Sequence, residues 1–121
     1  MIRDVTDLAV YKLSLELVGS SYTLTRQLPK SELSSVSQIN RASKSIVANI
    51  AEGFAKRQSE KEFKRFLKIA LGSSDEVVTH LRTKYLVLPR FRSEIEILAN
   101  SYKTLSKRIH KLQSIWKSDN F

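Results

Sequence analysis

The chain of 121 residues contains no cysteine and only three glycines and two prolines. Without cysteine it can form neither a disulfide framework nor a thiolate metal site, and this absence fits a reducing compartment. Folds built from strands and hairpins need more turn-forming residues than this chain has. No stretch approaches the roughly 20 apolar residues of a membrane-spanning helix, and the N-terminus lacks the apolar run of a signal peptide. We therefore expect a helical protein of the cytoplasm that does not enter a membrane.

Negative charge is also scarce, because 12 acidic residues stand against 21 lysines and arginines, for a formal net charge of +9. Such an excess favours negatively charged partners, and phosphate polymers and anionic membrane surfaces are the usual ones. The alternative is a basic protein whose charge serves only its solubility.

Apolar residues recur at alternating spacings of three and four, which is typical of amphipathic helices in a bundle. This pattern predicts four helices, over residues 8–28, 34–55, 60–88 and 91–117, in one domain that spans residues 1–121. The connections are short, so sequential helices are expected to be antiparallel neighbours. The expected fold class is all-α, an up-down-up-down four-helix bundle.

The same spacing predicts which residues form the core seam of each helix. In the first helix they are Leu8, Tyr11, Leu15, Val18 and Tyr22. In the second they are Ile39, Ala42, Ile46, Ile50 and Phe54. In the third they are Phe63, Leu67, Ala70, Ser74, Val77, Leu81 and Leu88, and in the fourth Phe91, Ile95, Leu98, Tyr102, Leu105, Ile109, Leu112 and Trp116.

Four large apolar residues fall off these seams, namely Leu17, Leu24, Ile97 and Ile115. We expect these four residues to be exposed, which on a small bundle favours a second buried face, and self-association would supply one. The alternative is that they are scattered single exposures, which are normal on soluble proteins.

Two glycines and one serine mark local features of the predicted helices. Gly53 lies near the end of the second helix, where glycine tolerates a positive φ. Ser59, with Glu62 three residues later, has the pattern of a capping box for the third helix. Gly72 lies inside the third helix, where glycine costs about 1 kcal/mol relative to alanine. Close approach of a neighbouring backbone would offset that cost, and a hinge or a ligand contact is the alternative.

No group of residues indicates catalysis or metal binding. His80 and His110 lie on different predicted helices, and Glu76 precedes His80 by four residues rather than the three of the di-iron motif. The chain has neither a nucleophile elbow nor a glycine-rich phosphate loop. We expect a protein that is not an enzyme and that needs no cofactor and no metal.

Basic residues concentrate where the second predicted helix meets the third. This corner cluster consists of Lys56, Arg57, Lys61, Lys64, Arg65 and Lys68. The positive end of the third helix dipole lies at the same corner, so an anion would meet both mobile cations and backbone N–H groups. Arg41 and Lys44 add charge to the second helix. The alternative is a solvated face on which Glu60 and Glu62 pair with Lys64 or Lys68.

A second basic group, the C-terminal stripe, consists of Lys103, Lys107, Arg108 and Lys111. No acidic residue lies between Glu96 and Asp119, so this polar face carries one sign of charge. Aromatic residues do not interleave either cluster as base-stacking platforms require. The pattern favours contact with a nucleic-acid backbone that depends strongly on salt, and solubility alone is the alternative.

Four segments carry a resemblance to a known family. They are DLAVY at residues 7–11, SQINRA at 37–42, NIAEG at 49–53 and KEFKRFLKIALGS at 61–73. On these motifs the chain resembles the 23S rRNA-intervening-sequence proteins, which are four-helix bundles. The match covers the first three predicted helices, whereas the fourth matches only in being amphipathic.

The resemblance implies a ring-shaped homopentamer. The chain is also similar to the accessory proteins of diversity-generating retroelements, which share that architecture and are linked to nucleic acid and a reverse transcriptase.

The sequence departs from the family pattern at two positions of the second predicted helix. Asn40 precedes Arg41 where the family often has two basic residues, which leaves Arg41 as the only cation of the pair. Val47 stands where proline is common, so the second helix is expected to be straighter.

The family motif also contains Asn49 and Glu52, which share a helical face. We expect both to anchor the corner structurally, with bonds to N–H groups near Ser59 or to Arg41 or Arg57, because buried polar groups need partners. Gly53 and Gly72 complete the set of residues with an expected structural role.

Two functional hypotheses remain open. The first is a non-catalytic oligomer that binds RNA through Arg41, Lys44, Lys56, Arg57, Lys61, Lys64, Arg65 and Lys68, with the C-terminal stripe as a secondary surface. The second is a protein-interaction scaffold whose basic surface docks an acidic partner or a nucleic-acid enzyme such as a reverse transcriptase.

Overall fold

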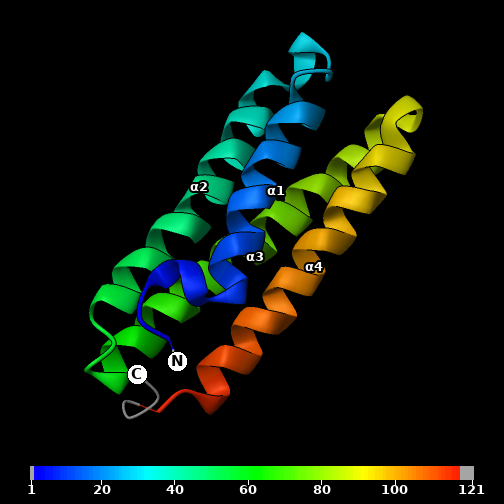
Figure 1. Cartoon of the computed structure of the whole chain (residues 1–121). Coiled ribbons are helices and arrows are strands. Elements are labelled where there is room, and N and C mark those ends of the chain that lie inside the picture. Colours follow the sequence, from blue (N-terminus) through cyan, green and yellow to red (C-terminus); the bar gives the residue numbers. More distant parts are fainter. Residues whose placement is uncertain (1, 118–121) are drawn as a thin grey trace.

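The computed structural model describes residues 2–117 and contains four long α-helices and no strand within that range (Figure 1). The helices are α1 (Ala9–Thr25), α2 (Leu33–Ala55), α3 (Glu60–Val87) and α4 (Arg92–Ile115). Three short 3-10 helices, η1 (Val5–Asp7), η2 (Lys30–Glu32) and η3 (Pro89–Phe91), precede α1, α2 and α4. None of the described helices is both long and apolar enough to cross a membrane.

The connections between the helices alternate between the two ends of the bundle. The α1–α2 and α3–α4 connections lie at one end, and the α2–α3 connection lies at the other (Figure 1). Helix α3 packs extensively against both α2 and α4, whereas α1 packs less extensively, against α2 and then α4. The corner cluster therefore lies at the opposite end from the α1–α2 connection.

Side-chain caps fix the starts of two helices. Ser59 Oγ accepts a hydrogen bond from the Glu62 N–H at 3.2 Å, which is half of the predicted capping box. A complete capping box lies instead at η1. There the Asp7 carboxylate accepts a hydrogen bond from the Asp4 N–H, and the Asp4 carboxylate accepts one from the Thr6 N–H. Hydrogen bonds from Thr6 lower the pKa of Asp4, and those from the Arg3 and Asp4 N–H groups lower the pKa of Asp7.

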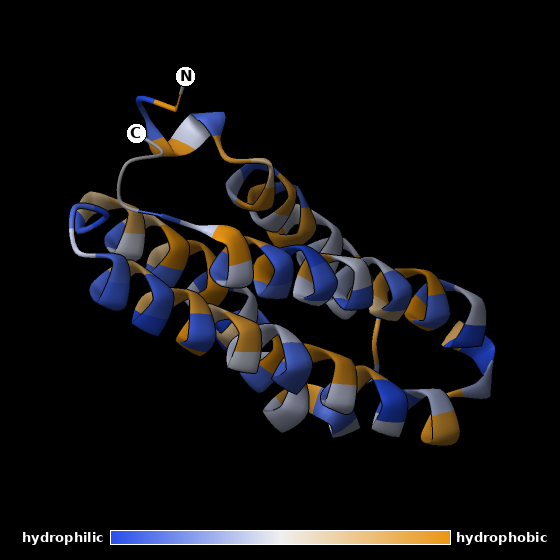
Figure 2. Cartoon of the chain, turned by 90° about the horizontal axis from the view of Figure 1, so that it is seen from below, coloured by the Kyte–Doolittle hydropathy of each residue, from blue (hydrophilic) through white to orange (hydrophobic). Residues whose placement is uncertain are grey.

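The predicted core seams of α2, α3 and α4 are confirmed in their central turns. Hydrophobic and hydrophilic residues alternate along each helix (Figure 2), which matches the amphipathic pattern of the sequence. Fully or nearly fully buried seam residues include Ile39, Ile46, Ile50, Phe63, Leu67, Val77, Leu81, Tyr102, Leu105 and Ile109. Leu88, Phe91 and Leu112, at the ends of their seams, are only half-buried.

The predicted seam of the first helix is confirmed at Leu8, which is buried, and at Tyr11, which packs against the core, but it is wrong at Leu15. Leu17 and Leu24, which were expected to be exposed, are each 4% exposed, whereas Leu15 is 47% exposed. The reason is that hydroxyl residues share the buried face of α1, so a purely apolar pattern places that face incorrectly. Ile97 and Ile115 are exposed as expected, so only two of the four residues that favoured self-association remain.

Two of the buried hydroxyl groups of α1 make hydrogen bonds to α2, while the third, on Ser14, donates to the Tyr11 carbonyl within α1. Ser21 Oγ donates to Asn40 Oδ1 at 2.9 Å, and Asn40 Nδ2 donates to Thr25 Oγ1 at 3.1 Å. Buried polar groups cost little when they are paired in this way. Asn40, where the resembling family often has a cation, is therefore part of the α1–α2 contact.

The two glycines with an expected structural role behave differently from the prediction. Gly53 does not have a positive φ. A Cβ added at Gly53 would lie 2.6 Å from Phe66 Cβ and 3.1 Å from Phe63 Cδ1, so this glycine allows α3 to approach α2. Gly72 is exposed, and a Cβ there would meet nothing within 4 Å. The prediction that a neighbouring backbone of this chain packs closely against Gly72 is therefore wrong.

Candidate nucleic-acid interface

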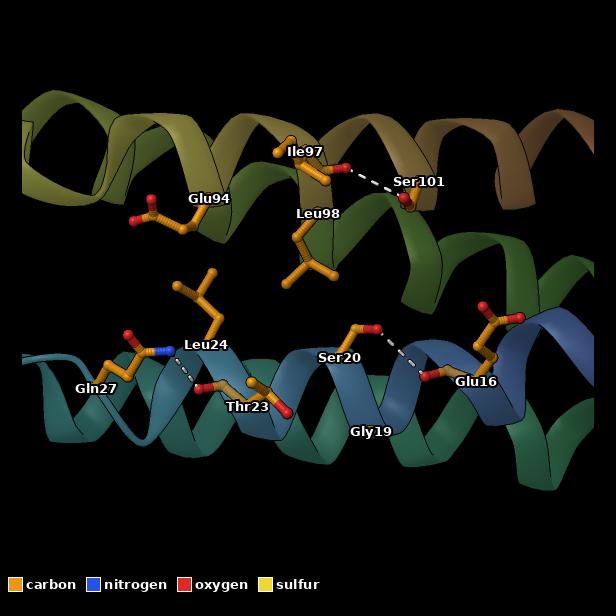
Figure 3. Close-up of a pocket in the computed structure, with 10 residues that line it drawn as sticks. All are labelled: Glu16, Gly19, Ser20, Thr23, Leu24, Gln27, Glu94, Ile97, Leu98 and Ser101. Carbon is orange, nitrogen blue, oxygen red and sulfur yellow. Dashed lines mark hydrogen bonds between the residues drawn. The ribbon is translucent and has the colours of Figure 1, made fainter.

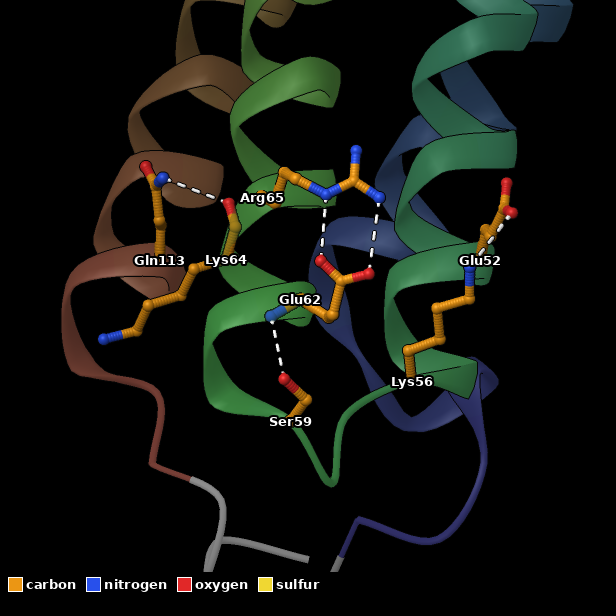
Figure 4. Close-up of polar contacts among 7 residues, drawn as sticks. All are labelled: Glu52, Lys56, Ser59, Glu62, Lys64, Arg65 and Gln113. Atoms are coloured by element: carbon orange, nitrogen blue, oxygen red, sulfur yellow. Dashed lines mark hydrogen bonds and ion pairs between the residues drawn. The ribbon is translucent and has the colours of Figure 1, made fainter.

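Half of the corner cluster is paired with carboxylates on neighbouring helical turns (Figure 4). Arg65 Nε lies 2.9 Å from Glu62 Oε2, and its Nη2 donates to Glu62 Oε1 at 3.4 Å. Lys64 Nζ lies 3.5 Å from Glu60 Oε2. The hydrogen bond from Arg65 lowers the pKa of Glu62 and raises the pKa of Arg65. The alternative that the glutamates pair with lysines of this face is therefore confirmed for Lys64, whereas Glu62 pairs with Arg65 instead of a lysine.

Glu52 does not have the partners that the sequence predicted. Its Oε1 lies 3.6 Å from Lys56 Nζ, and the side chain is 58% exposed (Figure 4). Because Glu52 remains in solvent, it does not need the buried partner that was expected. Asn49 is half-buried and donates through Nδ2 to the Ser45 carbonyl at 2.8 Å, so its bond lies within α2 rather than at the corner.

Aromatic rings hold several of the corner cations against the protein. The Arg57 guanidinium lies 4.1 Å from the centre of the Phe54 ring, and its Nη1 donates to the Phe54 carbonyl at 3.1 Å. Lys56 and Arg65 lie 4.8 Å and 4.4 Å from the centre of the Phe66 ring. Such cation–π contacts are most favourable where the cation is partly desolvated. These residues therefore help to hold the α2–α3 connection.

Lys61 and Lys68 are the corner cations that remain open to a ligand. Both are exposed, and neither forms an ion pair with any residue in the range 2–117. They lie on the same helix as the paired Lys64 and Arg65. The sequence predicted one basic surface at the corner, and the structure divides it into paired cations and unpaired ones.

Arg41 and Lys44 lie beside an aromatic residue that the sequence placed in the core. They line a cavity of about 330 Å³ together with Ser37 and Asn40 of α2 and Tyr22 of α1. Lys44 Nζ lies 5.6 Å from the centre of the half-buried Tyr22 ring. The sequence predicted no aromatic residues interleaved with the corner cluster or the stripe. The structure nevertheless brings Phe54 and Phe66 to corner cations and Tyr22 to Lys44. No spacing along α2 could have indicated Tyr22, because the ring comes from another helix.

The C-terminal stripe is the basic group with the least local compensation. Its four residues are all exposed, and none forms an ion pair within the described part of the chain. Lys103 and Lys107 line a cavity next to α3, whereas Arg108 and Lys111 line another next to Leu8 at the start of α1. The stripe therefore faces two neighbouring grooves.

One hydrogen bond joins the turn of α4 that follows the stripe to a residue of the corner cluster. Gln113 Nε2, two residues beyond Lys111, donates to the Lys64 carbonyl at 3.2 Å (Figure 4). This bond joins the last turns of α4 to the first turn of α3. The turn of α4 that follows the stripe therefore packs against the part of α3 that carries the corner cluster.

The α1–α4 contact presents a surface of the opposite charge. A cavity of about 510 Å³ lies there, with Leu24 and Leu98 directed toward one another and Ile97 beside them (Figure 3). Its charged lining residues are Glu16 and Glu94. Carboxylates repel phosphate, so this groove is unsuited to a polyanion.

The histidines do not assemble a metal site. His80 Nε2 lies 3.6 Å from Glu76 Oε2, while His110 is exposed on α4. Within the described residues, no group of three or more histidine and carboxylate side chains is placed to hold a metal ion.

Comparison with known proteins agrees with this fold. The family model described as 23S rRNA-intervening sequence protein matches residues 6–113. The chain belongs to the 23S rRNA-intervening sequence protein family. Because the match extends to residue 113, it includes most of α4, which corrects the expectation that only the first three helices carry the resemblance.

A crystal structure supports the same assignment for this 23S rRNA-intervening sequence protein. It is of a protein with unknown function from the S23 ribosomal protein family of Bacteroides thetaiotaomicron, with a TM-score of 0.79 and 27% identity. The alignment covers 87% of this chain and 98% of that chain. No curated protein matches the chain.

Proposed function

We propose that this chain is a non-catalytic, basic nucleic-acid-binding protein that contacts the RNA backbone. The observation that carries the proposal is the C-terminal stripe, whose four exposed cations form no ion pair within residues 2–117. Unpaired cations can exchange their counterions for phosphates without first breaking an internal contact. The family name and the net charge of +9 point in the same direction.

The contact surface in this proposal joins the stripe on α4 to the corner cluster, toward the end of the bundle that holds the α2–α3 connection. Lys61 and Lys68 contribute most at the corner, because Lys56, Lys64 and Arg65 already have carboxylate partners. Arg41 and Lys44 extend the surface along α2. Backbone contacts of this kind position a nucleic acid but read little of its sequence.

The functional unit in this proposal is a cytoplasmic homo-oligomer of antiparallel bundles, with the pentameric ring that the family resemblance implies. Exposed Ile97 and Ile115 supply apolar surface for contact between chains. An oligomer repeats the basic surface, so a long RNA can contact several copies at once.

The test compares two variants with the same loss of charge. Lys103→Gln with Lys111→Gln removes two stripe cations, while Lys12→Gln with Lys30→Gln removes two exposed lysines outside the proposed surface. Affinity for a structured RNA is measured across a salt series. We expect the stripe variant to flatten the plot of log K against log salt by roughly 0.7–0.9 for each lost phosphate contact. Equal slopes for the two variants would contradict the proposed surface.

A protein-interaction scaffold predicts a different outcome for the same experiment. A scaffold would bind RNA only when its protein partner is present, so the purified chain would show no RNA binding at low salt.

A further inference from the structure

The groove between the middle of α3 and α4 has an unusual lining for a basic surface. It is a cavity of about 280 Å³ whose polar lining comprises Arg82, Lys103 and Lys107, the hydroxyl residues Thr79 and Ser106, and one carboxylate, Asp75. Arg82, Thr79 and Asp75 come from α3, and the other three come from α4. The sequence pattern did not indicate Arg82, because the residues that accompany it lie on another helix.

The three cations of this groove are available to an anion. Arg82, Lys103 and Lys107 are exposed, and none forms an ion pair with a residue in the range 2–117. Arginine presents a planar fork of donors that matches two phosphate oxygens, and lysine adds a compact point charge. Together they can hold one phosphate group.

Asp75 makes the groove more specific than a simple phosphate site. Its Oδ1 accepts a hydrogen bond from Ser106 Oγ at 2.9 Å, and Oδ2 receives no hydrogen bond from the described residues. A carboxylate repels a phosphate, but it is a strong acceptor for a hydroxyl group. Cations beside one open carboxylate oxygen therefore match a ligand that carries a phosphate and a hydroxyl donor a short distance apart.

We propose that this groove binds one ribonucleotide unit of RNA and distinguishes it from a deoxyribonucleotide. Arg82, Lys103 and Lys107 contact the phosphate, and Asp75 Oδ2 accepts a hydrogen bond from the ribose 2′-hydroxyl. The 2′-hydroxyl is the group by which a protein can tell RNA from DNA at a given site. The inference rests on the proposed RNA-binding function and adds to it a preference for RNA.

The experiment measures binding of single-stranded RNA and DNA of the same sequence to five proteins: the natural chain, Asp75→Ala, Asp75→Asn, Glu76→Ala and Arg82→Gln. Glu76 is the matched control, because it is the adjacent exposed acid, lies next to His80 and does not line the groove. Removing either acid raises the affinity for any polyanion by the same charge effect. Only Asp75→Ala also removes the proposed acceptor.

We expect the natural chain to prefer RNA by about tenfold, the value of one hydrogen bond to a charged acceptor. Asp75→Ala should abolish most of that preference, mainly through tighter DNA binding, while Glu76→Ala should leave the RNA-to-DNA ratio unchanged. Arg82→Gln should weaken RNA and DNA binding by the same factor. Asp75→Asn, which keeps an acceptor oxygen and conserves shape, should retain part of the preference.

Two results would overturn the inference while leaving the proposed function intact. One is equal affinity of the natural chain for RNA and DNA, and the other is an identical change in the RNA-to-DNA ratio in Asp75→Ala and Glu76→Ala. Failure of the natural chain to bind either nucleic acid at low salt would overturn the proposed function as well, so the two failures are distinguishable.

Discussion

Lys84 Nζ lies 3.0 Å from Glu32 Oε1, which joins the last turn of α3 to η2 across 52 positions of sequence. The Lys84 side chain is only 1% exposed and also contacts Ser35 Oγ at the start of α2. An ammonium group in such a place is costly unless it is paired and hydrogen-bonded. This contact therefore fixes the start of α2 against the end of α3, at the end of the bundle opposite the corner cluster.

Removal of the acid from this pair should destabilise the protein more than replacement of the lysine. Glu32→Ala leaves the buried Lys84 ammonium without its counter-charge, which costs about 3 kcal/mol of unfolding free energy. Lys84→Met fills the same space with an apolar side chain, and Glu32, which is 22% exposed, stays partly hydrated. Urea denaturation of both variants measures the difference, and a larger loss for Lys84→Met would contradict this account of the pair.

Gly53→Ala should destabilise the bundle, because the new Cβ would lie 2.6 Å from Phe66 Cβ, an atom held close to the α3 backbone. Overpacking of this kind costs about 1–3 kcal/mol, which exceeds the roughly 1 kcal/mol that alanine gains over glycine in a helix. Gly72→Ala is the control, because nothing lies within 4 Å of the added atom. It should raise the unfolding free energy by up to about 1 kcal/mol, and a loss of stability in the control would show that Gly72 is packed against something outside this chain.

Tyr102 should make stability fall at high pH. It is fully buried, its hydroxyl donates to the Leu17 carbonyl at 3.1 Å, and burial raises its pKa above the usual value near 10. Below pH 10 both states hold the phenol proton. Above pH 10 the unfolded chain releases it and the folded chain retains it, so folding loses about 1.4 kcal/mol per pH unit.

The Tyr102→Phe variant isolates this effect. Near pH 8 it should be less stable than the natural chain by about 1 kcal/mol, because the hydrogen bond to Leu17 is lost. The difference should shrink between pH 10 and pH 11, because phenylalanine does not titrate. Urea denaturation at each pH provides the comparison, and a difference that stays constant up to pH 11 would contradict the burial of the phenol.

The fold could be predicted where apolar residues alone form the buried face. Ile39, Ile46 and Ile50 of α2 and Tyr102, Leu105 and Ile109 of α4 follow the spacing of three and four and are buried. Helix α1 could not be predicted in the same way, because Ser14, Ser21 and Thr25 take buried positions and satisfy their hydroxyl groups by hydrogen bonds. The burial of Lys84 could not be predicted either, because its partner Glu32 lies on a different element, η2.

The candidate interface could be predicted as a set of basic residues but not as a surface. Spacing along one helix identified the corner cluster and the C-terminal stripe. It could not show that Glu62 holds Arg65, that Gln113 brings α4 to Lys64, or that Arg82 and Asp75 share a groove with the stripe. Each of these relationships depends on side-chain conformation or on packing between helices.

The most direct test of the central claim is binding of the purified protein to a structured ribosomal RNA fragment across a salt series, with the mass of the protein determined in the same buffer. We predict tight binding at low salt by an oligomer, with a steep negative slope of log K against log salt, because unpaired cations on α3 and α4 release counterions from the phosphates. An absence of RNA binding at low salt by a correctly folded oligomer would contradict the claim.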